Sequence, residues 1–328
     1  MIKRLVVFFL IISLGASSKV MAQDPEFSQF YANLLYLNPA FAGSVKCPRL
    51  ALSYRNQFPK LGSVYVTPSF SYDQHFDFLQ GGVGLMVYND IQGNGAINTI
   101  NVSGIYSYTL NISRTFAIKG GFQATYLQKK LGDEFTFPDQ IHPLYGPVFP
   151  TQEDYVSTDF KKSLFDVTAG FVGFSKDYFF GISVAHLTQP SESFREASDA
   201  YLPRKYTVHF GTTIPISNRN FKRGELSISP NFLFQQQEDM QQINYGLYLS
   251  RTSIVFGMWL RQNFKAHFDS YIMMIGYIQS KMKFAYSYDL TISKLKNQTL
   301  GAHEVSVSFQ LNCKQKKKKF RTISCPSF

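Results

Sequence analysis

The histidines are the residues of this sequence best suited to catalysis or metal binding. The chain has six of them, and His186 and His209 are the best candidates for a metal pair or for the base of a hydrolase. Neither stands at ligand-type spacing from another histidine or from a cysteine. We therefore expect no metal site.

The common enzyme motifs are absent as well. The sequence contains no HExxH helix, no phosphate-binding loop and no GxSxG elbow. The glycine-rich run 81–84 begins a strand-like segment and opens no helix, so it indicates close approach of strands rather than phosphate binding. A lipase built on a membrane barrel would not need the elbow, so enzyme activity stays possible and unsupported. We expect a non-enzyme without a cofactor.

Two long loop-like stretches, 129–162 and 188–203, are the best candidates for a binding surface. Connections beyond about 12–15 residues are usually functional or disordered, and the first has too many aromatic residues and prolines for simple disorder. The residues that we expect to contact a binding partner are Phe135, Phe137, Pro138, Asp139, Gln140, Tyr145, Thr188, Gln189 and Pro190.

The basic character of the chain belongs mostly to its ends. The formal charge is +11, and removal of three basic residues in 1–22 lowers it to +8. Six more basic residues lie in the tail 312–328, including Lys316, Lys317, Lys318 and Lys319. The body is nearly neutral, which gives little support to nucleic-acid binding. The tail is either simply solvated or makes an electrostatic contact with an acidic periplasmic partner or lipid phosphates.

Residues 1–22 have the pattern of an export signal. A basic start is followed by the short apolar run 5–14 and by a small residue, Ala22, before the expected cleavage point. The leader, residues 23–46, comes next and is rich in aromatic residues without a helical or strand period. It either packs on the fold, plugs it or contacts a partner in the periplasm. The contact candidates are Phe27, Phe30, Tyr31 and Asn38.

Alternation of apolar and polar residues is the main structural signal. In 303–311, Val305, Val307 and Phe309 alternate with polar side chains, as a half-buried strand requires. Such runs predict fourteen strands, near 47–54, 64–72, 82–89, 96–109, 115–128, 163–174, 178–187, 204–214, 225–234, 241–250, 254–261, 269–278, 283–290 and 303–311. Pro68 and Pro230 within these runs suggest bulges.

Long and short connections alternate along the chain, as in outer-membrane barrels with short periplasmic turns. A soluble sandwich or propeller would not require this alternation. We therefore predict an all-β fold: a transmembrane antiparallel β-barrel of about 14 strands over residues 47–311. The leader and the tail would lie in the periplasm, and the three longest loops outside.

The three cysteines allow more than one pairing. Cys47 opens the first strand and Cys313 follows the last, and these strands are neighbours in a closed barrel. A disulfide between them would join the seam. The alternatives are a Cys313–Cys325 bond within the tail, or no disulfide.

Many short segments of the sequence resemble motifs of the PorP/SprF family of outer-membrane proteins from the type IX secretion system of Bacteroidetes. They include QDPEFSQFYAN and LYLNPAFAG (23–43), YRNQFP (54–59), GVGLMVYNDIQGNG (82–95), FTFPDQI (135–141), SKDYFFGISVAHLTQPSESF (175–194), LPRKYTVHFG (202–211), SPNFLFQQQ (229–237), YSYDLTISKL (286–295) and HEVSVSF (303–309). Leu34 stands where the family pattern has proline.

The resemblance implies an accessory, non-enzymatic barrel in the outer membrane. Its expected partners are periplasmic and cell-wall-associated components of the machinery, outer-membrane lipid, and secreted cargo with a C-terminal sorting domain, gliding adhesins among them. The other function in keeping with a barrel is that of a general porin or small-solute transporter. A leader and loops that fill the lumen would favour the first, and an open polar channel would favour the second.

Overall fold

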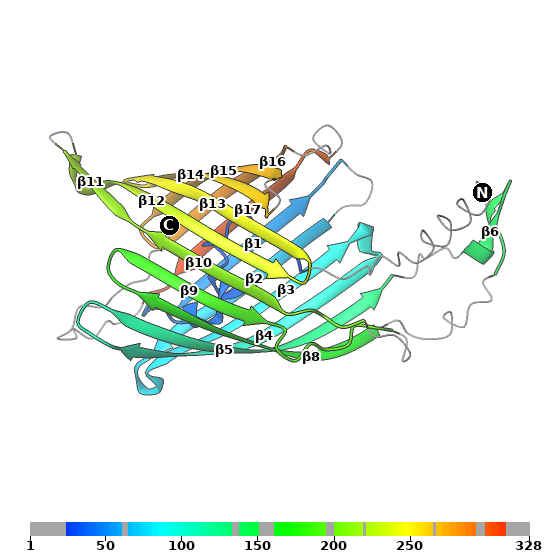
Figure 1. Ribbon diagram of the computed structural model, residues 1–328, viewed down its shortest axis with the longest axis horizontal. Helices are drawn as coiled ribbons and strands as arrows, with labels where there is room; N and C mark the ends of the chain where they lie inside the picture. The colour runs from blue at the N-terminus through cyan, green and yellow to red at the C-terminus, as the bar shows by residue number, and fades with distance from the viewer. Residues whose placement is uncertain are drawn as a thin grey trace, which may run out of the picture.

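The computed structural model describes residues 24–60, 65–132, 138–150, 161–194, 200–218, 221–264, 267–292 and 299–312. Within these ranges the chain forms one large antiparallel sheet that closes into a barrel (Figure 1). The expected signal peptide and the basic tail from Cys313 onward, with Lys316–Lys319, lie outside the described residues.

The barrel has fourteen strands, which confirms the predicted number and the predicted fold. The strands are β1 (Arg49–Gln57), β2 (Tyr65–Phe76), β3 (Gly81–Gln92), β4 (Ile97–Asn111), β5 (Ala117–Leu131), β8 (Lys161–Phe174), β9 (Tyr178–Ala185), β10 (Lys205–Thr212) continued by β11 (Ile214–Asn218), β12 (Phe221–Gln237), β13 (Met240–Arg251), β14 (Ile254–Asn263), β15 (Phe268–Gln279), β16 (Met282–Thr291) and β17 (Ala302–Gln310).

Neighbouring strands pair in chain order, and two further pairings complete the ring. The first strand pairs with the last, with Arg49 opposite Gln310, and β10 pairs with β12, with Lys205 opposite Gln237. Where neighbouring strands pair, closure of the ring lets the backbone hydrogen bonds of a membrane-embedded sheet be satisfied internally.

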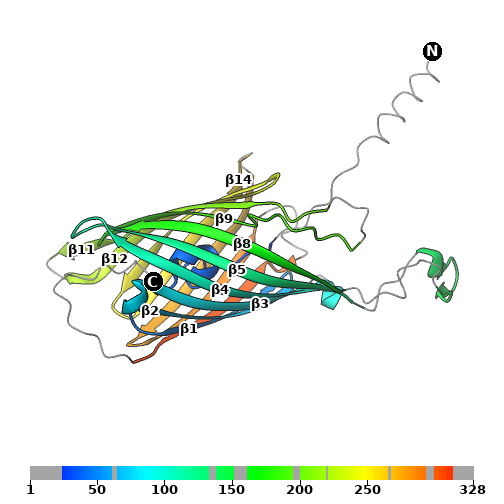
Figure 2. The same cartoon turned by 90° about the horizontal axis from the view of Figure 1, so that it is seen from below.

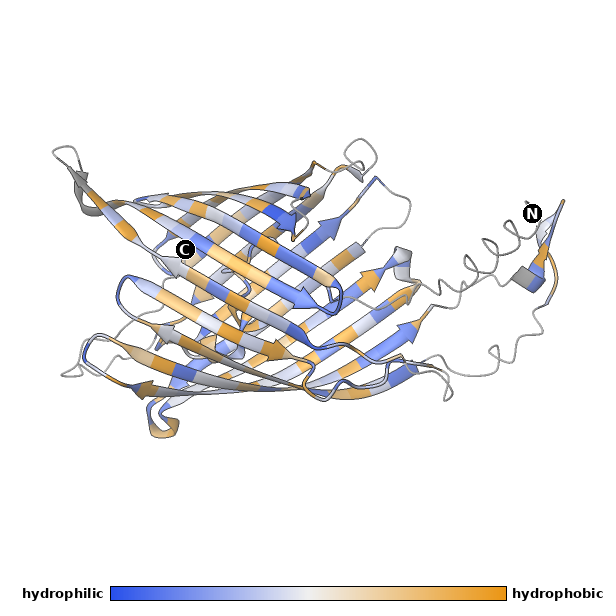
Figure 3. Cartoon of the chain, in the orientation of Figure 1, coloured by the Kyte–Doolittle hydropathy of each residue, from blue (hydrophilic) through white to orange (hydrophobic). Residues whose placement is uncertain are grey.

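The alternation read from the sequence separates the two faces of the barrel wall. On β1, Leu52 and Tyr54 point outward and are about half exposed, whereas Ser53 and Arg55 point inward and are buried. The same alternation of apolar and polar residues runs along the other strands in Figure 3. An apolar outer face suits contact with lipid. In the part of the chain that the structure describes, no helix has the length and apolarity needed to cross a membrane.

The expected alternation of connections is also present. Short turns at one end, which we call the short-turn end, include 112–116, 175–177, 252–253 and 280–281. The other end, the long-loop end, carries the connections 132–160, 186–204 and 292–301. Within the first of these, η4 (Pro138–Gln140) precedes a small hairpin of β6 (Ile141–His142) and β7 (Gly146–Pro147). Shorter 3-10 turns are η2 (Asp77–Leu79) and η3 (Gly93–Gly95).

The bulges expected at the two prolines are not found. The register of β12 on β13 runs without a shift through Pro230, and the pairs of β2 with β3 on either side of Pro68 keep one register. Pro230 instead faces the interruption between β10 and β11, because proline has no N–H to donate across the ladder. Among the described strands, register shifts occur between Ile216 and Asn218 and between Arg261 and Gln262.

The leader lies inside the barrel. Its short helix α2 (Leu34–Leu37) and the turn η1 (Pro39–Phe41) are enclosed by the strands, as the blue segment in Figure 2 shows. Of the alternatives that the sequence left open for the leader, the structure therefore agrees with the plug. The physical reason is that its aromatic and polar side chains find partners on the inward faces of strands from all around the wall.

Candidate functional site

The leader fills the short-turn half of the lumen with a continuous apolar core. Phe30, Tyr31, Leu34, Leu37, Ala40 and Phe41 join one cluster with inward side chains of β5, β8 and β9 on one wall and of β12–β16 on the other. Phe30 meets the chain's single tryptophan, Trp259, with ring centroids 5.1 Å apart. Tyr31 meets Phe179 at 5.4 Å, also edge to face. The cluster spans the lumen from wall to wall.

Several glycines of the wall leave room for the leader. A Cβ atom would come too close to it at Gly82 on β3 beside Ala42, at Gly121 on β5 beside Ala40, and at Gly170 on β8 beside Asn38. At the first two positions the leader backbone lies against the strand, and at the third the Asn38 side-chain amide does; only glycine leaves room for so close an approach. The wall is therefore shaped to the leader at three strands on one side of the barrel, β3, β5 and β8.

Asn38 joins the leader to the strands behind it. Its side-chain amide donates to the carbonyl oxygens of Phe171 and Ile182, at 3.1 Å each, and lies 3.3 Å from Nε2 of His209. Its Oδ1 accepts from the backbone N–H of Ala40 and so begins η1. This fully buried side chain satisfies polar groups that would otherwise be costly to bury.

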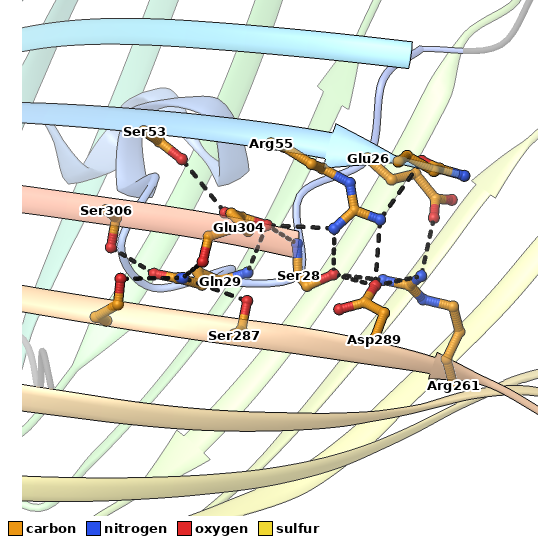
Figure 4. A network of polar contacts seen from close by, with 12 residues as sticks. Glu26, Ser28, Gln29, Ser53, Arg55, Arg261, Ser287, Asp289, Glu304 and Ser306 are labelled. Atoms are coloured by element: carbon orange, nitrogen blue, oxygen red, sulfur yellow. Dashed lines mark hydrogen bonds and ion pairs between the residues drawn. The ribbon is translucent and has the colours of Figure 1, made fainter. Parts of the chain in front are cut away.

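Ser28 and Gln29 join the leader to the seam of the barrel (Figure 4). The backbone N–H of Ser28 donates to Glu304 Oε2 at 2.6 Å, and Gln29 Nε2 donates to the Glu304 carbonyl at 2.9 Å. Ser306 in turn donates to Gln29 Oε1. These contacts occupy β17, the strand that closes on β1.

Two arginines and two acids surround Ser28 in the same network (Figure 4). Arg55 binds Asp289 at 3.1 Å and Glu304 at 3.4 Å, and Arg261 binds Asp289 at 3.2 Å. Both arginines also donate to the Ser28 hydroxyl, at 2.6 and 3.2 Å. All four charged side chains are buried, so each needs the others to remain ionised there.

A second charged group holds the start of the leader. His186, which follows β9, is 2.9 Å from Asp24 through Nε2 and 2.9 Å from Asp166 through Nδ1. Lys205 lies 3.6 Å from Asp24. Burial alone would lower the pKa of His186, but the two carboxylates outweigh it and raise the pKa to about 10. Burial would raise the pKa of Asp24, yet the His186 and Lys205 cations hold it below its ordinary value.

The long-loop half of the lumen holds a cavity of about 740 Å³, which we call the cup. Its floor includes the start of the leader, Asp24–Glu26, and its wall is formed where the strands end. The polar residues of this wall include Gln57, Thr67, Asp90, Gln92, Thr99, Asn101, Lys129, Gln241, Gln242, Gln262, Asn263 and Asp269. The cup is the candidate functional site, because it joins a cavity to convergent polar groups.

The four leader residues that the sequence offered as contacts for a periplasmic partner are all buried. Phe27, Phe30 and Tyr31 lie in the lumen with at most 6% of their surface exposed, and Asn38 is fully enclosed. In this structure none of the four presents a surface to a partner. They hold the leader in place.

The expected loop residues fall into two separate places. Asp139 and Tyr145 are exposed in and beside the β6–β7 hairpin, and Gln140 accepts hydrogen bonds from 148 and 149 through its carbonyl. The backbone of Pro138 begins η4, while Phe135 and Phe137 lie outside the described residues. The hairpin belongs to the connection 132–160, whereas residues 188–190 belong to the connection 186–204.

The second loop lies beside the start of the leader. Thr188 is exposed and donates to Asp166 Oδ1 at 2.7 Å, beside the His186 pair. The N–H of Gln189 donates to the His186 carbonyl, and the carbonyl of Pro190 accepts from Leu202. This loop and the leader, which the sequence treated as separate candidates, therefore meet at His186.

Cys47 is disulfide-bonded. Its neighbour Pro48 accepts a hydrogen bond from Leu311 at 2.8 Å, so the start of β1 runs beside the end of β17. This is the arrangement that the seam disulfide requires, but Cys313 and Cys325 both lie outside the described residues. The pairing Cys47–Cys313 remains a prediction, and non-reducing peptide mapping would identify the partner.

The two histidines considered for chemistry have separate structural roles. His186 binds Asp24 and Asp166, whereas His209 packs between Phe41 and Phe179 and faces Asn38. Among the described residues, no group of three or more potential ligands is arranged to hold a metal ion.

The sequence reading missed the buried charges of the lumen. Arg55, Arg261, Asp289 and Glu304 were not among the candidates, although each is a charge at an inward position of its strand. That was an available signal, because a charge among small polar residues on a lumen-facing row needs a partner inside.

Comparison with known proteins supplies the family. The family described as "Type IX secretion system membrane protein PorP/SprF" matches residues 20–309. No curated protein matches the sequence significantly.

Several solved outer-membrane barrels are similar at low sequence identity. The toluene transporter TodX of Pseudomonas putida has 7% identity and a TM-score of 0.49, with 89% of this chain and 98% of that chain covered. The toluene transporter TbuX of Ralstonia pickettii has 10% identity and a TM-score of 0.46, with 84% and 90% covered. Omp33 of Acinetobacter baumannii has 8% identity and a TM-score of 0.45, with 80% and 98% covered. Nothing about the function of this chain follows from likeness this distant.

Proposed function

We propose that this chain, which belongs to the PorP/SprF family of type IX secretion system membrane proteins, acts as an accessory barrel that holds secreted cargo rather than as a solute channel. Its family and its closed barrel with an apolar outer face make it an outer-membrane protein of that system. The family is one of secretion-system membrane proteins, not of enzymes, and membership implies association with the secretion machinery.

The observation that carries the proposal is the filled short-turn half of the lumen. The apolar cluster of the leader reaches both walls, and the leader is held by Asn38, Ser28 and Gln29 to strands on opposite sides. A diffusion channel needs a continuous water path, whereas a receptor needs only a site on one side. A plugged barrel with a cup at one end fits the second role.

In this proposal the long-loop end faces the outside, and the cup with its surrounding loops receives cargo that carries a C-terminal sorting domain, gliding adhesins among the possible cargoes. The exposed hairpin at 141–147 supplies apolar contacts, since Leu144 and Tyr145 are 83% and 75% exposed. Loops held by a rigid barrel are the usual place for such contacts. The short-turn end and the basic tail would then serve periplasmic and cell-wall-associated partners, and the outer face would contact outer-membrane lipid.

Affinity purification from outer membranes followed by mass spectrometry tests the proposal. The full chain should retain secreted proteins with a sorting domain, and a variant in which 139–149 is replaced by a short glycine-serine linker should retain fewer. Recovery of the same proteins by both variants would remove the hairpin from the proposal. Recovery of no secreted protein, together with steady ion conductance of the purified barrel in a planar bilayer, would favour the porin.

Sidedness has its own test. An epitope tag inserted beside Pro147 should be labelled by antibody on intact cells, because the long-loop end is proposed to face outward. Labelling only after lysis would show that the barrel has the opposite orientation.

A further inference from the structure

The charges that line the cup do not balance. Its lining contains five acids, Asp24, Glu26, Asp90, Glu192 and Asp269, against three bases, Arg55, Lys129 and Arg261. Formal charges of one sign in a cavity attract ligands of the other sign.

Each base of the cup already has an acidic partner. Lys129 binds Glu192 at 3.0 Å, and Arg261 lies 3.7 Å from Glu26 as well as beside Asp289. Arg55 forms ion pairs with Asp289 and Glu304 below the floor of the cup. The cup therefore has little positive charge to offer an anionic ligand.

Two of the acids have no such partner. Asp90, near the end of β3, accepts from Thr67 at 2.9 Å and from Gln92 at 2.6 Å, both neutral donors. Asp269, near the start of β15, makes no side-chain hydrogen bond to any described residue and is exposed to the cavity. Among the described residues neither carboxylate lies within ion-pair distance of a cation.

A buried amide points to the same kind of ligand. Gln242 lines the cup with 7% of its surface exposed, and its Nε2 donates to Glu26 at 3.1 Å. Its Oε1 accepts no hydrogen bond from any described residue. A buried acceptor without a donor is costly, so Gln242 also favours a ligand that donates a hydrogen bond.

We propose that the cup binds a basic peptide segment, with lysine or arginine side chains between the carboxylates of Asp90 and Asp269 and with backbone N–H groups on the surrounding amides. This rests on the proposed function, since a secreted protein is what brings a peptide to this end of the barrel. It adds the chemical features by which the cup would select the peptide segment. These are cationic side chains and more hydrogen-bond donors than acceptors. The cavity of about 740 Å³ is large enough for a few residues of extended chain.

Binding of three labelled pentapeptides to the purified full-length barrel in detergent tests the inference. The peptides are Gly-Lys-Gly-Lys-Gly, Gly-Gln-Gly-Gln-Gly and Gly-Glu-Gly-Glu-Gly with a neutral fluorophore, followed by fluorescence anisotropy. The lysine peptide should bind most tightly, and added salt should weaken it. The double variant Asp90→Asn, Asp269→Asn should weaken that peptide about tenfold and leave the glutamine peptide unchanged, because two partly screened ion pairs are lost.

The matched control is Asp177→Asn, which removes an exposed acid from a turn at the opposite end of the barrel. It should leave all three affinities unchanged. Equal affinity for the three peptides, or unchanged binding of the lysine peptide by the double variant, would overturn the inference. Unboiled electrophoresis, in which folded barrels migrate faster, confirms that each variant is folded.

Failure of this inference can be told apart from failure of the proposed function. If deletion of the gene releases a surface protein into the medium but the purified barrel does not prefer the lysine peptide, the proposed function stands and the basic-peptide inference falls. If the barrel prefers the lysine peptide but the deletion releases no surface protein, the inference about the cup stands and the cargo role falls.

Discussion

The two halves of the lumen are lined by different kinds of wall. At the short-turn end, glycines and buried apolar side chains face the leader, and the space is filled. At the long-loop end, amides, hydroxyls and carboxylates face a cavity of about 740 Å³. One barrel therefore contains a packed interior and an open site, divided by a chain segment of about twenty residues.

The difference shows that the leader belongs to the fold of this barrel. Where it packs, the wall has glycine at positions 82, 121 and 170, and the space beside them is filled by leader backbone at Gly82 and Gly121 and by the Asn38 side chain at Gly170. Where it stops, the wall keeps side chains that can bind something else. A change in the filled half should therefore cost stability, and a similar change in the cup should cost little.

The largest effect is expected from Arg55→Met. The substitution leaves Glu304 and one side of Asp289 buried without their cation, which should destabilise the docked leader by about 3–5 kcal/mol. Fluorescence of Trp259 during urea unfolding measures this, because Phe30 of the leader packs on its ring. In the cup, Lys129→Met should cost about 1 kcal/mol or less, since that pair lines an open cavity in which water can solvate the Glu192 carboxylate left behind. Equal losses from the two variants would contradict the contrast between the halves.

A smaller effect is expected from Gly121→Val. The new side chain would collide with the backbone of Ala40, and overpacking of this kind costs roughly 1–3 kcal/mol. The strain should loosen the leader and let ions pass, so planar-bilayer recordings should show more frequent openings than in the wild type.

Gly104→Val is the control for that recording, because a Cβ atom at Gly104 on β4 meets open space. It should conduct no more than the wild type. Openings that are as frequent in this variant as in Gly121→Val would mean that loss of glycine in a strand, rather than a displaced leader, causes the leak.

The smallest effect concerns pH at the boundary between the halves. The pKa of His186 is raised from 6.5 to about 10. Protonated His186 therefore stabilises the docked leader fully below pH 6.5, and this contribution is lost as the pH rises through about 10. Neutral imidazole has a single N–H, so His186 then keeps one of its hydrogen bonds to the two aspartates and loses the other, and the loss should be on the order of 1 kcal/mol.

Urea unfolding followed by Trp259 between pH 6 and 11 would measure this step. His186→Gln keeps a hydrogen-bonding side chain that does not titrate, so its stability should show no step near pH 10. A step of the same size in both proteins would assign it to groups other than His186.

The barrel could be predicted from the sequence because the alternation within each strand shows which side chains face outward and which face inward. On β4, Val102 and Tyr106 alternate with Asn101, Ser103 and Ser107, and the structure places the first set outside and the second inside. Such a pattern needs no knowledge of the partner strand. Strand number and the order of long and short connections follow from it.

The place of the leader could not be predicted in the same way. Its partners are distant in sequence: Ser28 binds Glu304, 276 positions away, and Asn38 binds Ile182, 144 positions away. No period within the leader encodes such contacts. The cup was missed for the same reason, since it exists only after the leader has filled the other half of the lumen.

The contact between the leader and β17 is expected to form late in biogenesis. Ser28 leaves the export machinery near the beginning of synthesis, whereas Glu304 arrives with the last strand. Bringing such distant groups together carries a large loop-closure entropy, so the contact forms late. An assembly intermediate that lacks β17 also lacks one of the two acids that bind Arg55. We therefore expect joining of the seam and sealing of the interior to occur as a single cooperative step.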